Sequence, residues 1–105
     1  MALIEASDSG VLIQNSDISS NTVGQNGVLF IQNSDSIQVL NSVIGSNVGE
    51  ISSVLTSHYS NANFDACEIR DNYAIDQTIQ ALGSEMKFNR TTFDGNLGPL
   101  ISNGF

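Results

Sequence analysis

A four-residue pattern, an apolar residue followed by two variable residues and an asparagine, occurs four times in this chain at nearly constant spacing. The copies begin at Ile18, Ile44, Ile69 and Phe93 and end at Asn21, Asn47, Asn72 and Asn96. By subtraction of their numbers, these asparagines are 26, 25 and 24 residues apart. A fixed period of this length is typical of solenoids, in which each repeat stacks on the next. The pattern therefore predicts a stack of similar coils.

The residues that precede each apolar anchor align with the same period. Small residues stand two positions before it, at Ser16, Ser42, Cys67 and Thr91. Apolar residues stand five positions before it, at Ile13, Val39, Phe64 and Phe88, and seven positions before it, at Val11, Ile37, Ala62 and Met86. Apolar and polar residues alternate around the anchor, which is the pattern of a strand with one buried face. Equivalent residues should therefore form columns along the stack.

Two of these columns carry structural predictions. We expect Ile18, Ile44, Ile69 and Phe93 to form an inward apolar core column. We expect Asn21, Asn47, Asn72 and Asn96 to form a ladder of amides, each hydrogen-bonded to its counterpart in the next coil. Asparagine also tolerates positive φ better than most residues, so we expect it to be the corner residue itself.

A second short strand per coil is expected at residues 2–4, 28–30, 53–55, 79–81 and 100–102, with polar turns between strands. The chain then reads as one all-β domain over residues 1–105, a parallel β-helix of about four coils. The approximate coil bounds are 2–27, 28–52, 53–78 and 79–99, followed by a partial coil at 100–105. Strands in such a fold pair with their counterparts about 4.8 Å away along the axis.

The repeated phrase resembles the repeats of the polymorphic outer membrane protein family. Those repeats carry F-x-x-N and G-G-A-(I/L/V) tetrapeptides on a right-handed β-helix of the pectin-lyase-like type. Here Phe93-Asp94-Gly95-Asn96 is a literal F-x-x-N, and Gly27-Val28-Leu29 and Gly98-Pro99-Leu100 take the place of G-G-A. The resemblance implies a right-handed solenoid that acts as an adhesin at a cell surface.

Charge excludes several classes of partner. Charged residues make up 13% of the chain and the net charge is −8, with Arg70, Lys87 and Arg90 as the only fixed cations. Nucleic-acid binding needs clustered cations, so we expect no nucleic-acid partner. An anionic membrane surface would repel the chain, and no apolar run is long enough to span a bilayer, so we expect no membrane insertion. The first residues lack the features of a signal peptide, so an export signal would lie outside this chain.

The sequence offers few candidate catalytic residues. Glu68, Asp71 and Asp94 are the acids that a glycoside hydrolase on this fold would use, and such enzymes need paired carboxylates. A lyase would need a base together with Arg and Ca²⁺, and register places Arg70 beside Asp94, where a surface ion pair is expected. The carbohydrate-active enzyme is therefore kept as the alternative to a non-catalytic protein.

The remaining reactive residues favour structural roles. His58 is expected to be a loop residue, and Cys67 a buried thiol without a partner for a disulfide or zinc site. No metal site or cofactor is expected, although calcium at Asp35 or Asp76 is kept as an alternative because these loops are acidic. Asn89-Arg90-Thr91 is a glycosylation sequon, which matters only in a eukaryotic secretory route.

The two ends of the chain suggest how it is used. Each end is expected to stop within a coil without a cap, as in a fragment of a longer β-helix or a subunit that stacks end to end. The leading hypothesis is a non-catalytic spacer, adhesin or filament subunit of an extracellular or surface protein. Its partners would be other coils or identical subunits, with a glycan or surface protein as a further partner. An intracellular scaffold is a third hypothesis.

Overall fold

A computed structural model describes residues 3–23, 27–50, 52–75, 77–97 and 101–104. These residues contain thirteen strands and no helix. The first sheet contains β1 (Ile4–Ser7), β4 (Leu29–Gln32), β7 (Ser52–His58), β10 (Gln77–Leu82) and β13 (Ile101–Gly104). The second contains β2 (Val11–Gln14), β5 (Ile37–Leu40), β8 (Asn61–Asp65) and β11 (Glu85–Asn89). The third contains β3 (Asp17–Ser19), β6 (Val43–Gly45), β9 (Glu68–Arg70) and β12 (Thr92–Asp94).

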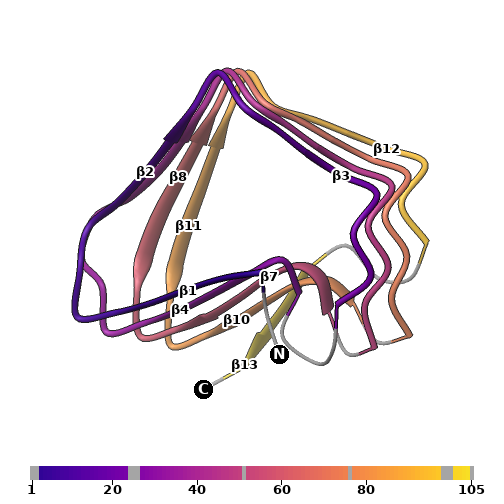
Figure 1. Ribbon diagram of the computed structural model, residues 1–105. Helices are drawn as coiled ribbons and strands as arrows, with labels where there is room; N and C mark the ends of the chain where they lie inside the picture. Colours follow the sequence, from indigo (N-terminus) through magenta and orange to yellow (C-terminus); the bar gives the residue numbers. More distant parts are fainter. Residues whose placement is uncertain (1–2, 24–26, 51, 76, 98–100, 105) are drawn as a thin grey trace.

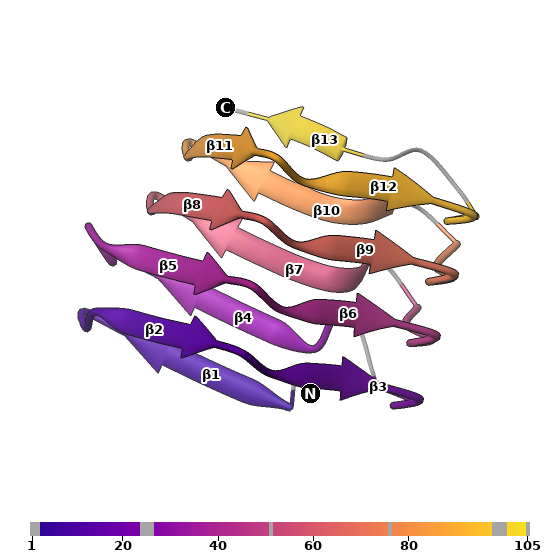
Figure 2. The same ribbon diagram turned by 90° about the horizontal axis from the view of Figure 1, so that it is seen from above.

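The three sheets form the walls of a parallel β-solenoid (Figure 1). Each strand pairs in parallel with the strand three places further along the chain, so β1 to β12 form four successive coils of three strands. Viewed from the side, the coils lie in register above one another, and β13 follows the fourth (Figure 2). The predicted all-β parallel solenoid is therefore confirmed. Its right-handed sense stays a prediction from the sequence resemblance.

The core lies inside the three walls and is built from stacked columns. Ile18, Ile44, Ile69 and Phe93 lie in register in the third sheet, and Ile13, Val39, Phe64 and Phe88 in the second. The members from the second and third coils are fully buried. Their counterparts in the first and fourth coils are only partly buried and pack against this core. Side chains inside the solenoid are therefore most completely buried in the second and third coils.

Strand bounds differ from the expected ones mainly in the first sheet. The expected strand at residues 53–55 extends to residues 52–58, so His58 is the last residue of β7 and not a loop residue. The strand continues to His58 because that residue pairs in register with Gln32 on β4 and with Leu82 on β10. Its ring meets the ring of Phe30 on β4 edge-on, with centroids 5.4 Å apart. Residues 2 and 100, which belonged to the first and last expected strands, lie outside the described residues, as do Gly98 and Pro99.

The solenoid turns at each corner through one residue in the left-handed region. These residues have φ between 47° and 67° and are Asp8, Asn33, Tyr59 and Gly83 after the first sheet, Asn15, Asn41, Ala66 and Arg90 after the second, and Ser20, Ser46, Asp71 and Gly95 after the third. The expectation that Asn21, Asn47, Asn72 and Asn96 adopt positive φ is therefore wrong. The preceding residue turns the chain, which frees the asparagine side chain to bond to the backbone.

A side-chain hydrogen bond closes each type of corner and offsets its strain. After the first and second sheets the residue that follows the turn donates to the carbonyl two residues back, as in Ser16 Oγ to Gln14 O at 2.8 Å. After the third sheet Asn21 does the same, whereas the other three asparagines donate their Nδ2 to a carbonyl of the preceding coil. A left-handed conformation costs a non-glycine residue about 1–2 kcal/mol. A net hydrogen bond contributes about 1 kcal/mol, so the two effects are comparable. This balance allows residues such as Ala66 and Arg90 to occupy corners.

Candidate functional site

The asparagine corners form a continuous ladder of hydrogen bonds. The backbone N–H of each of Asn21, Asn47 and Asn72 donates to the Oδ1 of the next asparagine at 3.0 Å. Their Nδ2 atoms donate to the same Oδ1 atoms at 3.1, 3.0 and 2.9 Å. Asn47 and Asn72 are completely buried, and each Nδ2 also reaches a carbonyl in the preceding coil. These amides are fully used in holding the coils together.

A serine ladder at the corner after the first sheet was missed in the sequence analysis. Its members are Ser9, Ser34, Ser60 and Ser84. The backbone N–H of each of the first three donates to the Oγ of the next, at 3.4, 3.0 and 3.1 Å. The signal was their spacing of 25, 26 and 24 residues, which follows the asparagine period. Because serine is abundant in this chain, the spacing alone did not distinguish these four from the others.

The three candidate acids are held in different settings. Glu68 lies on β9 and pairs with Arg70 at 3.3 Å between Oε1 and Nε, and Asp94 lies on β12 in register with Arg70. The expected ion pair between Arg70 and Asp94 is therefore wrong. Both acids share a face with Arg70, and the guanidinium pairs with Glu68, two residues earlier on its own strand. Asp71 is at the corner, where its side chain lies against Gly95.

An open hollow of about 510 Å³ between the second and third sheets contains two of these acids. Its lining comprises Asn41, Ser42, Val43, Ala66, Cys67, Glu68, Arg90, Thr92 and Asp94. Asp71 is not among the lining residues. The hollow thus brings Glu68 and Asp94 to one surface, while Glu68 is already engaged by Arg70.

A second hollow of about 250 Å³ lies on the outer face of the second sheet. Its floor includes the column Gln38, Asn63 and Lys87, whose members are in register on β5, β8 and β11. Lys87 pairs with Glu85 at 3.6 Å between Nζ and Oε1. The surface is therefore a row of amides with a neutralised cation at one end.

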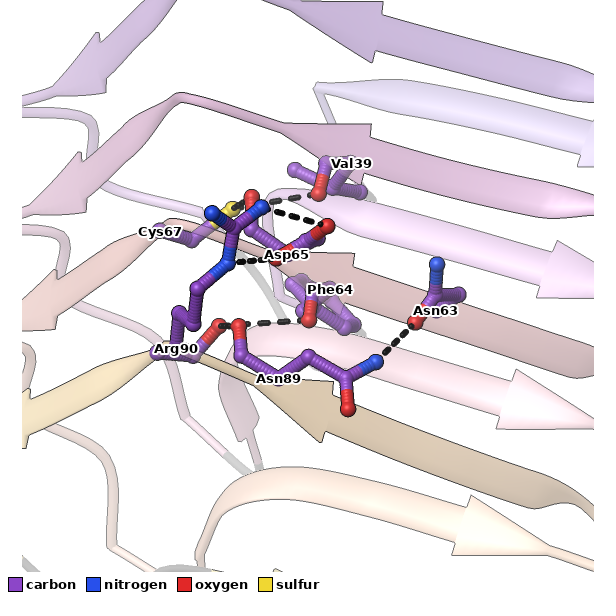
Figure 3. Close-up of polar contacts among 8 residues, drawn as sticks. Val39, Asn63, Phe64, Asp65, Cys67, Asn89 and Arg90 are labelled. Carbon is purple, nitrogen blue, oxygen red and sulfur yellow. Dashed lines mark hydrogen bonds and ion pairs between the residues drawn. The ribbon is translucent and has the colours of Figure 1, made fainter.

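Asp65 and Arg90 form a two-pronged ion pair at the corner after the second sheet (Figure 3). Nε and a terminal guanidinium nitrogen of Arg90 donate to the two carboxylate oxygens of Asp65, each at 3.0 Å. These bonds hold the pKa of Asp65 below its ordinary value of 3.8 and raise the pKa of Arg90. All three fixed cations of the chain therefore have an acidic partner.

The pair should make a pH-dependent contribution that is lost in acid. Because the folded state lowers the pKa of Asp65, the contribution is complete above the ordinary aspartate pKa and disappears as the pH falls through the lowered value. We expect Arg90→Gln to raise the pKa of Asp65 toward 3.8, as measured by NMR titration of its carboxylate. Lys87→Gln is the matched control and should leave this pKa unchanged. An equal rise in both variants would contradict the assignment.

Cys67 lies next to this pair, and its expected burial is confirmed. Its Sγ is 3.1 Å from the carbonyl oxygen of Val39 and 3.4 Å from that of Asp65, so the thiol occupies the corner position that a serine hydroxyl takes at Ser16 and Ser42 (Figure 3). The thiol is thus a member of the small-residue column.

The sequon residue Asn89 is exposed at the end of β11, and its Nδ2 donates to Asn63 Oδ1 at 3.1 Å (Figure 3). A glycan on Asn89 would be attached at this same Nδ2 atom. Among the residues that the structure describes, no three His, Cys, Asp or Glu side chains are placed to hold a metal ion. Asp76, one of the residues considered for calcium, lies outside them.

A line of apolar side chains runs along the outside of the solenoid after the third sheet. Val48, Tyr73 and Leu97 are joined by parallel bridges and are 42%, 45% and 60% exposed. Ile75 nearby is 70% exposed. Exposed apolar residues in a contiguous group are typical of a contact surface, whereas single ones are common on any protein. This line is therefore a candidate contact surface on the described coils.

Within the described part of the chain, no helix has the length and apolar character needed to cross a membrane. Comparison of the chain with protein-family models, curated proteins and solved structures yields no match.

Proposed function

We propose that this chain is a non-catalytic structural module, a rigid β-helical spacer or adhesive segment of an extracellular or surface protein. One observation carries the proposal. The buried ladder asparagines are engaged in joining the coils, and each of the three fixed cations pairs with an acid. The surface location follows the resemblance of the repeated phrase to adhesin repeats.

Hydrolysis of a glycan is less well supported by this arrangement. A glycosidase needs two carboxyl groups on either side of the scissile bond, one of them free to act as an acid. Glu68 and Asp94 share a hollow, but the carboxylate of Glu68 is paired with Arg70. A lyase would need a free base and cations for uronate groups, and Arg70, Lys87 and Arg90 are all paired.

An adhesive role has a surface on which to act. The line of Val48, Tyr73 and Leu97 offers apolar groups at regular intervals along the axis. A repeated apolar line suits contact with an extended partner, because successive groups on both sides are spaced by the coil rise. A protein or glycan partner at this surface is part of the proposal.

An activity screen tests the proposal. The purified chain and the double variant Asp71→Asn/Asp94→Asn are assayed for release of reducing ends and unsaturated products from neutral and uronate polysaccharides. We expect no cleavage above the protein-free background for either. Cleavage by the native chain that the double variant abolishes would overturn the proposal and establish a carbohydrate-active enzyme. The Gln38→Ala variant, which changes the hollow on the outer face of the second sheet and none of the candidate acids, is the control.

A further inference from the structure

The apolar line of Val48, Tyr73 and Leu97 belongs to the side of the solenoid. Thr22 is the equivalent residue of the first coil, so the apolar side chains occupy the second, third and fourth coils. The residues before and after each exposed side chain turn inward, as Asn72 and the residue that follows Tyr73 do, and both of these are buried. The line therefore projects from a closed and well-bonded corner.

An acidic residue stands on each side of this line. Asp71 precedes Tyr73 by two residues and is exposed on the side of the third sheet, where its side chain lies against Gly95. Glu50 is exposed on the other side, and its carbonyl oxygen accepts the N–H of Ile75 at 2.9 Å. Within the part of the chain that the structure describes, neither carboxylate has an ion-pair partner, because all three fixed cations pair with other acids. The apolar line is thus bordered by two carboxylates without a cation.

The spacing along the line matches the turns of a helix. Neighbouring coils are about 4.8 Å apart, so Val48 and Leu97 are separated by about 9.6 Å along the axis. In an α-helix, residues i and i+7 lie on one face and are about 10.5 Å apart along its axis. In a β-strand, side chains on one face repeat every 6.7 Å or so, about 2 Å more than the coil rise. A helix parallel to the solenoid axis can therefore contact successive members of the line with successive turns.

The acids also distinguish between kinds of partner. Two copies of this chain facing each other through the line would oppose acids to acids, and each copy has a net charge of −8. A glycan has less to bind, since Tyr73 is the one aromatic member of the line, and Val48 and Leu97 offer no polar side-chain atoms to its hydroxyl groups. A partner with cations on both sides of an apolar stripe complements both features of the surface.

We propose that the apolar line binds an amphipathic helix of a partner protein, in which Lys or Arg residues flank the apolar stripe. This inference rests on the proposed adhesive role and names its partner. The apolar stripe of the helix covers Val48, Tyr73 and Leu97, and its cations lie beside Asp71 and Glu50. Burial of apolar surface supplies the driving force, and the opposite charges select the partner and its position.

Binding of a synthetic peptide to the full chain tests the proposal by fluorescence anisotropy. The probe is an Ala-rich helical peptide of about 18 residues, with Leu repeated at i, i+3, i+4 and i+7 and Lys on both sides of this stripe. We expect a scrambled peptide of the same composition, and a peptide with Glu in place of Lys, to bind about tenfold more weakly. The proposal is overturned by equal binding of the scrambled peptide, or by no binding of the probe at millimolar concentration.

A pair of apolar variants places the binding site. Tyr73→Ser/Leu97→Ser removes two exposed side chains of the line, and we expect it to weaken binding of the probe by about tenfold or more. Leu12→Ser is the matched control, because Leu12 is 59% exposed on the second sheet. It should bind like the native chain. Equal weakening by both changes would contradict the assignment, and thermal unfolding shows whether each variant is folded.

A second pair of variants tests the two acids. We expect Glu50→Gln/Asp71→Asn to weaken binding by about threefold at low salt, and the difference from the native chain to vanish at high salt because exposed ion pairs are screened. Glu5→Gln/Asp8→Asn removes the same amount of charge from the first coil and is the control. An equal effect of both double variants would mean that only the net charge matters, which would overturn the proposal.

NMR spectra of the native chain keep the test independent of the variants. We expect the probe to shift the amide signals of Val48, Tyr73 and Leu97 most, and largest shifts on another surface would overturn the proposal. Shifts at this line caused by neutral or uronate oligosaccharides, without any caused by the probe, would overturn it in favour of a glycan. The activity screen involves neither peptide nor line, so failure of helix binding and failure of the non-catalytic function are distinguishable.

Discussion

Replacing Asn72 with leucine is expected to lower the free energy of unfolding by about 3–6 kcal/mol, because buried partners lose their hydrogen bonds. The Oδ1 of Asn72 accepts from the backbone N–H and the Nδ2 of Asn47, and its Nδ2 donates to the carbonyl of Ile44. Asn47 is fully buried, so water does not reach its N–H in the folded protein. Equilibrium unfolding in urea measures the loss.

Asn21→Leu is the matched control in the same ladder. The side chain of Asn21 only donates, to Ser19 O and Asn47 Oδ1, and no described group depends on its Oδ1 as an acceptor. Its loss should cost about 1 kcal/mol, the net value of an ordinary hydrogen bond. Equal destabilisation by the two substitutions would show that the ladder contributes through side-chain volume and not through buried hydrogen bonds.

Phe64→Ala is expected to destabilise the protein by about 3–5 kcal/mol, the cost of a large-to-small change in a core that cannot collapse. Phe64 is fully buried on β8, and its ring stacks on that of Phe88 with centroids 5.2 Å apart. The coils above and below are held in register by their ladders, so they cannot move inward to fill the cavity. Thermal and urea unfolding measure the effect.

Phe30→Ala is the control for this prediction. Phe30 lies on the outward side of β4, is only half-buried and meets His58 edge-on. Its truncation leaves a surface depression that water fills, so we expect a loss of about 1 kcal/mol. Similar losses at Phe30 and Phe64 would mean that the solenoid interior relaxes around a cavity.

Both predictions rest on an energetic property of solenoids. Each coil contacts only its neighbours, so the stability of the stack is close to a sum of coil and interface contributions. The partial burial of Ile18 and Phe93 beside the complete burial of Ile44 and Ile69 shows this dependence on neighbours. Substitutions in the second and third coils should therefore cost more than equivalent substitutions in the first and fourth.

The fold was predictable because equivalent residues must share one environment. Ile18, Ile44, Ile69 and Phe93 repeat at the coil length, and only a stack with that length places all four inside. The amide of asparagine carries both a donor and an acceptor, so its repetition at the same period predicts contact between neighbours. This periodicity remains recognisable in the sequence although the residues between the strands vary in number and type.

The details of the corners were not predictable in the same way. The chain turns at residues as different as Ser46, Tyr59 and Ala66, and no residue type distinguishes them in the sequence. A left-handed conformation at these positions is imposed by the register of the flanking strands and by the hydrogen bond of the following residue. The pairing of Arg70 with Glu68 and not with Asp94 likewise depends on the conformation of the arginine side chain, because both acids lie on the same face of the sheet.

The sequence by itself determined the period, the columns and hence the parallel solenoid, because burial repeated every 24 to 26 residues leaves few other folds. The tertiary structure decided which residues bend the chain, which acids pair with the three cations and in which direction the ladder hydrogen bonds run. Those properties depend on hydrogen bonds between residues about 25 positions apart. These bonds run in one direction along each ladder, and that direction arises only when the coils are stacked.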